Sequence, residues 1–151
     1  MSQLVYLLYE LFGQIRMPVN LFGEWCSTWQ PTTDPGWDWV EETVTIRRSI
    51  FGIRLINDNN SKGYVWQGKG KLIHKKYLVG EWASRRPGSN AEGIFALTFE
   101  SDGRCLLGYF MSRDVNRRKI ISGFVLARTK EEMINGRKKL IAMRPQFPGT
   151  N

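Results

Sequence analysis

The sequence predicts an all-β protein, an eight-stranded antiparallel up-and-down barrel flanked by one short helix at each end. Three observations predict this fold. Apolar and polar residues alternate in successive segments from residue 20 to residue 128, turn-forming residues separate these segments, and no helical pattern interrupts them. With 151 residues, 42% of them hydrophobic and 13% aromatic, the chain is long and apolar enough to bury the core of one domain.

Eight segments carry the strand pattern. Residues 39–48 (WVEETVTIRR) place Val40, Val44 and Ile46 on one face, and Asp102-Gly103 forms a hairpin turn later in the chain. The expected strands are residues 21–30, 39–48, 50–57, 63–73, 76–84, 92–100, 104–113 and 119–128.

Helices are expected on both sides of the strands. Residues 2–15 have leucines at helical spacing after a capping serine, Ser2, and Pro18 follows the end of this helix. Thr129 and Glu132 have the spacing of a capping box. The second helix would use as its apolar side Met133, Ile134, Leu140 and Ile141. The chain then divides into an N-terminal helical segment (1–18), a barrel (19–128), and a C-terminal helix and tail (129–151).

A glycine recurs in a similar setting on four of the expected strands. Gly23, Gly80, Gly108 and Gly123 each follow apolar or small residues and precede an aromatic residue by one or two positions. Glycine inside a strand marks a bend or a close approach of neighbouring backbone, and closing a small barrel needs both. The aromatic residue two positions on would fill the space beside the glycine. This pattern favours a barrel over the alternative, a two-sheet sandwich.

The charge is strongly positive and unevenly distributed. The net charge is +8, and residues 101–151 contain 11 basic and 4 acidic side chains. This asymmetry favours an anionic partner, which would be a nucleotide, a nucleic acid or an acidic membrane surface. The alternative is a solvated surface with a high isoelectric point.

Several function classes lack the residues they need. The longest apolar run, residues 4–8, is too short to span a bilayer, and no signal peptide precedes it. His74 is the only histidine, and there is no phosphate-binding GxxxxGK[ST] loop. We therefore expect a non-enzymatic protein with no catalytic residue, metal or cofactor. Having only Cys26 and Cys105, it is expected in the reducing cytoplasm.

Binding residues are better represented. Arginines and small polar residues gather at strand ends in residues 84–90, 112–119 and 47–48, and arginine matches phosphate oxygens bidentately. Aromatic residues near strand ends are positioned to stack a nucleobase: Tyr64, Trp66, Trp82 and Tyr109. The mouth of the barrel is therefore the expected ligand site.

Two families share motifs with this chain. The pairs Gly23-x-Trp25 and Gly80-x-Trp82 resemble the first-strand signature of lipocalins and related calycin barrels. Residues 78–128 resemble the β-barrel sensor domain of two-transmembrane effectors in CBASS-type bacterial antiphage defence. The shared motifs are Leu78-x-Gly80-x-Trp82-x-Ser84-x-x-Pro87, Gly93, Leu107-Gly108-Tyr109-Phe110-x-Ser112-Arg113 and Gly123-x-Val125-Leu126-x-Arg128.

The second resemblance implies binding of a cyclic dinucleotide. The positions it carries over as ligand-facing are Ser84, Arg86, Tyr109, Ser112 and Arg113. The chain departs from that family in one respect, because only the short apolar segment 4–12 stands where the family has two membrane-spanning helices.

The sequence thus predicts a calycin-like barrel that binds an anionic small ligand, with a cyclic nucleotide suspected. Two alternatives remain open. A carrier of an apolar ligand would have a roomy interior lined by Trp25, Val44, Phe95 and Leu126. A nucleic-acid-binding or protein-interaction module would use the basic residues of 117–139.

Overall fold

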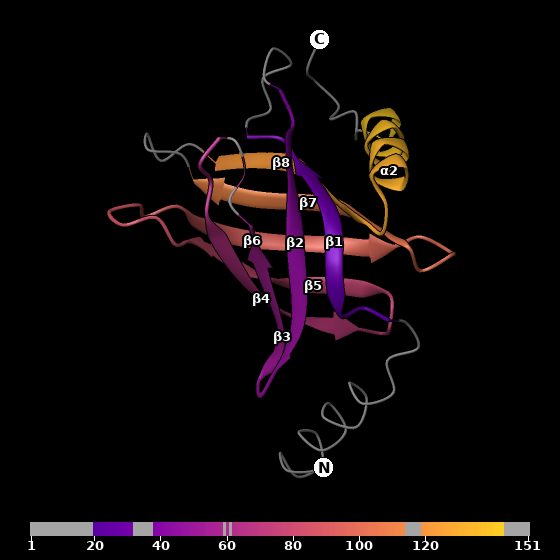
Figure 1. Ribbon diagram of the computed structural model, residues 1–151, viewed down its shortest axis with the longest axis horizontal. Coiled ribbons are helices and arrows are strands. Elements are labelled where there is room, and N and C mark those ends of the chain that lie inside the picture. Colours follow the sequence, from indigo (N-terminus) through magenta and orange to yellow (C-terminus); the bar gives the residue numbers. More distant parts are fainter. Residues whose placement is uncertain (1–19, 32–37, 59, 61, 114–118, 144–151) are drawn as a thin grey trace.

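The eight expected strands form a closed antiparallel barrel (Figure 1). The structure is a computed structural model, and it describes residues 20–31, 38–58, 60, 62–113 and 119–143. Each strand pairs with the next in sequence, and pairing of the first with the last closes the barrel. The strands are β1 (Gly23–Trp29), β2 (Val40–Ser49), β3 (Gly52–Asn57), β4 (Trp66–Ile73), β5 (Tyr77–Ser84), β6 (Glu92–Phe99), β7 (Cys105–Arg113) and β8 (Lys119–Ala127).

The predicted fold class is confirmed, including the helix after the barrel, α2 (Lys130–Ala142). The helix expected at residues 2–15 lies outside the described residues. β4 begins at residue 66 and not at 63, because the carbonyl of Tyr64 accepts a 2.8 Å hydrogen bond from the Asn57 side chain and does not pair with β5. No helix in the described part of the chain is long and apolar enough to cross a membrane.

The two ends of the barrel differ. The end reached by Trp29, Asn57, Ser84 and Arg113 carries the longer connections, and we call it the open end. The opposite end carries the β2–β3, β4–β5 and β6–β7 turns. It is closed near the axis by Trp25, which donates through its indole N–H to the Leu21 carbonyl (2.7 Å).

A layer of apolar side chains fills the closed half of the barrel. Leu21, Trp25, Val44, Leu55 and Leu126 belong to this core, and each is 1% exposed or less. The Arg128 guanidinium lies 3.8 Å from the centre of the Trp25 ring and donates to the carbonyls of residues 22 and 24. The closed end is therefore sealed by packing and by a cation–π contact.

Glycines let backbone and rings approach closely inside this wall. A Cβ on Gly80 would overlap with the Lys69 carbonyl oxygen, and one on Gly108 would overlap with that of Ala96. The expected close backbone approach is thus present at both positions. The space beside Gly80 is filled by Phe95 of β6, whose Cζ lies 2.7 Å from the position of the missing Cβ. The expectation that the aromatic residue two positions on would fill it is wrong there.

Helix α2 packs outside β7 and β8. The Thr129 hydroxyl accepts the Glu132 backbone N–H at 3.2 Å, which confirms the N-terminal cap. Met133, Gly136 and Leu140 are its buried residues. Ile141, expected on the apolar side, is 45% exposed, because the helix turns that position away from the barrel.

Candidate functional site

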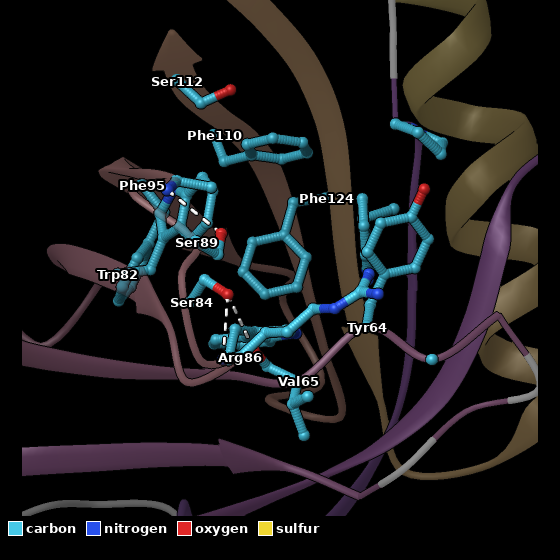
Figure 2. Close-up of a pocket in the computed structure, with 15 residues that line it drawn as sticks. Tyr64, Val65, Trp82, Ser84, Arg86, Ser89, Phe95, Phe110, Ser112 and Phe124 are labelled. Atoms are coloured by element: carbon cyan, nitrogen blue, oxygen red, sulfur yellow. Dashed lines mark hydrogen bonds between the residues drawn. The ribbon is translucent and has the colours of Figure 1, made fainter. Parts of the chain in front are cut away.

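A cavity of about 270 Å³ opens into the barrel at the open end (Figure 2). Its walls come from β1, β4, β5, β6, β7 and β8 and from the loops before β4 and before β6. The volume is near the lower limit of about 300–1,000 Å³ that is usual for small-molecule sites. The cavity therefore has room for one ring system with its substituents.

Aromatic side chains are the largest group among the described lining residues. These aromatic residues are Trp29, Tyr64, Trp66, Trp82, Phe95, Phe110 and Phe124. Neighbouring rings meet edge to face, with centroids 4.9 Å apart for Trp29 and Tyr64 and 5.9 Å apart for Trp82 and Phe110. Rings held edge to face present some of their π faces to the space between them, so the cavity is suited to a flat aromatic or apolar group.

Few polar groups reach this aromatic surface. Ser84, Ser89 and Ser112 line the cavity, and the Ser84 hydroxyl accepts the Arg86 backbone N–H at 3.1 Å. The indole N–H of Trp82 is buried and has no hydrogen-bond partner among the described residues. This N–H lies against Gly93 of β6, 2.8 Å from the position that a Cβ would occupy there, so it belongs to the wall and not to the surface of the cavity.

One cation belongs to the described part of the lining. Arg86 is exposed, and Figure 2 shows its side chain extending from the loop between β5 and β6 in the direction of Tyr64. Among the described residues of the lining, Tyr64 and Arg86 are ionisable, and none is a carboxylate, a histidine or a cysteine. The mouth therefore has a positive group that an anionic substituent of a ligand can reach.

A carboxylate beside the cavity holds two of its tryptophans. The Oε1 atom of Glu42 on β2 accepts the indole N–H groups of Trp29 (2.9 Å) and Trp66 (2.8 Å). Its Oε2 atom accepts the side-chain amides of Asn57 and Asn60, each at 2.8 Å. Burial raises the pKa of the Glu42 carboxyl, and these four hydrogen bonds oppose that rise.

The same network fixes the connection between β3 and β4. The Asn57 Oδ1 atom accepts the backbone N–H of Trp66 at 2.7 Å, and the Arg85 guanidinium donates to the carbonyls of Asn57 (2.9 Å) and Trp66 (3.1 Å). Because its N–H groups are used in this way, Arg85 positions the cavity wall, whereas Arg86 belongs to the lining at the mouth. The orientation of Tyr64 and Trp66 is thus set by buried hydrogen bonds.

The structure brings together six of the eight residues proposed from the sequence. The six that line the cavity are Tyr64, Trp66, Trp82, Ser84, Arg86 and Ser112. Tyr109 lies on the outer side of β7, packed with Cys105 and Leu107 under α2, because residues 109 and 112 of one strand point to opposite faces. Arg113 is the last residue of β7, and its side chain lies outside the described part of the structure.

Sequence reasoning missed three aromatic residues of the lining: Trp29, Phe110 and Phe124. Alternation supplied a signal for two of them. Phe110 shares a face with Ser112, and Phe124 shares one with Leu126, which was already expected inside. Of the interior expected for an apolar carrier, Phe95 lines the cavity, whereas Trp25, Val44 and Leu126 belong to the packed core.

Two of the basic clusters lie elsewhere. Arg47 and Arg48 are at the opposite end of the barrel, since β2 runs away from the open end, so the expectation that they share one rim with Arg86 is wrong. On α2, Lys130 and Arg137 lie 3.7 and 3.3 Å from the carboxylate of Glu41. Part of the basic C-terminal charge is therefore paired within the protein.

Within the described ranges, no three potential metal-ligating side chains lie together. What the described residues form at this end is a cavity lined mainly by aromatic side chains, with one cation at its mouth. Searched against known proteins, the chain matches no protein-family model and no curated protein sequence.

Proposed function

We propose that the protein binds a small anionic ligand with a planar ring, inserting the ring into the aromatic cavity and placing its negative charge beside Arg86. The observation that carries this proposal is the combination of seven aromatic residues and one cation among the described residues of the lining. Stacking and edge contacts with the rings would supply affinity, and the Arg86 guanidinium would select a ligand with a negative charge.

A cyclic nucleotide has both required parts, a heteroaromatic base with acceptors and a phosphate. The cavity volume of about 270 Å³ accommodates one base, so a cyclic dinucleotide would leave its phosphates and second base at the mouth. The resemblance of residues 78–128 to CBASS-type sensor barrels supports the same ligand class and, with it, a non-enzymatic role in bacterial antiphage defence.

The test is calorimetric titration with cyclic AMP, cyclic GMP, cyclic di-AMP and cyclic di-GMP. We expect at least one to bind, and Arg86→Ala to weaken it by about tenfold or more, since a charge-assisted hydrogen bond is lost. Arg104→Ala is the matched control: Arg104 is exposed at the opposite end of the barrel, 2.6 Å from Glu132, so its loss should leave affinity unchanged. Binding of none of the four compounds would overturn the cyclic-nucleotide assignment.

A second candidate function, the carrying of an uncharged apolar ligand, is favoured by the aromatic character of the lining. Arg86→Ala separates the two functions, because it would not weaken an uncharged ligand. Mass spectrometry of the protein extracted with organic solvent would identify such a ligand if it co-purifies.

We place this function in the cytoplasm. Cys26 and Cys105 are both free thiols, and burial raises the pKa of Cys105 to about 12, so this thiol stays protonated and unreactive. Unpaired cysteines are typical of proteins from a reducing compartment.

A further inference from the structure

The turn between β2 and β3 exposes two large apolar side chains at the closed end of the barrel. Ile50 is 86% exposed and Phe51 is 97% exposed, the two highest values among the large hydrophobic residues that the structure describes. Figure 1 shows this hairpin reaching beyond the neighbouring strands. Exposing two adjacent apolar side chains to water is unfavourable. Their position at a protruding tip indicates a surface that a membrane or another molecule covers.

The tip is held in a fixed conformation. Gly52, directly after Phe51, has a φ of 138°, and a Cβ at this position would lie 2.7 Å from the carbonyl oxygen of Gly70 on β4. The turn therefore rests against β4 and needs a glycine there. Ile50 and Phe51 are presented on a supported hairpin.

A row of cations follows on the outer surface of the same hairpin. Arg47 of β2 lies directly opposite Arg54 of β3, and Arg54 lies directly opposite Lys69 of β4. All three are exposed, and within the described residues none forms an ion pair with a carboxylate. Like charges placed opposite each other on neighbouring strands are destabilising, so an external anion would stabilise this row.

Two carboxylates lie next to this row of three cations, and the net charge of the group remains positive. Glu81 of β5 is the cross-strand neighbour of Lys69, and Glu24 of β1 lies opposite Thr45, two residues before Arg47. Arg54 donates through Nη2 to the Gln67 amide oxygen at 3.2 Å, a neutral partner. The hairpin therefore keeps a net positive outer surface next to its apolar tip.

We propose that this hairpin docks on an anionic lipid bilayer, with Ile50 and Phe51 entering the interface and Arg47, Arg54 and Lys69 contacting headgroup phosphates. Apolar side chains adjacent to basic ones are the arrangement that binds acidic membrane surfaces. A nucleic acid would satisfy the cations but would leave Ile50 without an apolar environment, so the membrane is the partner that fits both features. The open end and its cavity point away from the bilayer in this arrangement, and docking does not depend on the proposed ligand.

Flotation with lipid vesicles tests the proposal on the full chain. We expect the protein to float with vesicles of phosphatidylcholine and phosphatidylserine and to remain unbound with phosphatidylcholine alone. Neutralising the row with Arg47→Gln, Arg54→Gln and Lys69→Gln should weaken binding by about fivefold for each charge removed. Replacing Ile50 and Phe51 by serine should weaken it by about tenfold or more, because the inserted apolar area is lost.

Ile94→Ser is the matched control, since Ile94 is also a large exposed apolar residue (57%) but lies on the outer side of β6. It should float as the unchanged protein does. Thermal unfolding of every variant checks that the barrel is intact. The proposal is overturned if the protein does not float with the anionic vesicles, or if the tip variant floats normally. Binding of a single-stranded oligonucleotide that requires Arg47, Arg54 and Lys69, without vesicle binding, would identify a nucleic-acid surface instead.

Discussion

Trp66 donates its indole N–H to Oε1 of Glu42 at 2.8 Å, across the interior of the barrel from β4 to β2. Trp29 donates to the same atom, so one carboxylate fixes two rings of the cavity wall. The two asparagine amides on the other oxygen complete a set of four neutral donors. An ionised Glu42 is thus stabilised without a positive charge beside it, by hydrogen bonds to its charged form.

The first prediction follows from the number of donors. Glu42→Gln replaces one acceptor oxygen by an amide NH₂, which would face either two indole donors or two amide donors. We expect this conflict to lower the free energy of unfolding by about 2 kcal/mol, the typical cost of a buried donor without an acceptor. Glu41→Gln is the matched control: Glu41 is exposed and pairs with Lys130 and Arg137, so its loss should cost less than about 1 kcal/mol. Urea denaturation measures both, and equal losses would contradict the assigned role of Glu42.

The second prediction concerns pH. Because burial raises the pKa of Glu42 above its ordinary value of 4.5, the folded state binds more protons than the unfolded state between the two values. The contribution of Glu42 to stability is therefore fully present below pH 4.5 and is lost as the pH rises through the raised pKa.

Unfolding free energies measured from pH 4 to pH 8 on the original protein and on Glu42→Gln isolate this contribution by subtraction. The difference between the two proteins should shrink as the pH increases. A difference that grows with pH would mean that the four hydrogen bonds outweigh burial and that the pKa is lowered.

A third prediction tests the glycines of the barrel wall. Gly108→Ala would place a Cβ in overlap with the Ala96 carbonyl oxygen and 2.9 Å from the Leu97 Cα. Since backbone atoms of a neighbouring strand cannot move aside cheaply, we expect a loss of about 3 kcal/mol. Gly63→Ala is the comparison: it meets nothing within 4 Å, but its φ of 75° is unfavourable for alanine and should cost about 1 kcal/mol. A larger loss for Gly63→Ala in chemical denaturation would contradict this explanation.

The sequence was sufficient to predict the barrel because each strand carries its own alternation and each turn its own residues. It also contained a signal for Glu42 that was not used. Glu42 falls on the same face of its strand as Val40 and Val44, so alternation alone places a carboxylate among core residues. Its partners could not be predicted, because Trp29, Asn57 and Trp66 come from other strands whose register is fixed by the closed sheet.

The candidate site was predicted only in part, because its residues come from several strands whose pairing is not visible in any one segment. Ser84 was proposed from a motif and Trp82 from its place near a strand end, and both lie on the inner face of β5. Tyr109 was included because it belongs to a motif. Successive residues of a strand point to opposite faces, however, and because Phe110 faces the interior, Tyr109 faces outward. Phe95 was expected inside, but nothing in its own segment shows that it packs on Gly80 of a neighbouring strand.

The last prediction compares two tryptophans of the cavity whose N–H groups differ in use. Trp66 donates to Glu42, whereas the buried N–H of Trp82 has no partner in the described structure. Phenylalanine at either position shortens the ring and removes the donor. Trp66→Phe should therefore lose about 1–3 kcal/mol more unfolding free energy than Trp82→Phe, because it also leaves a buried carboxylate oxygen short of a hydrogen bond.

Although Trp82→Phe should cost less stability than Trp66→Phe, we expect it to weaken ligand binding. If a cyclic nucleotide stacks its base in the cavity, Trp82→Phe weakens it by about fivefold, because part of the stacking area is lost. Calorimetry with the tightest cyclic nucleotide measures this effect, and urea denaturation measures the stability difference. The stability comparison holds whether or not a nucleotide binds, so it tests the Glu42 network separately: equal losses for Trp66→Phe and Trp82→Phe would show that ring packing, and not the hydrogen bond to Glu42, fixes Trp66.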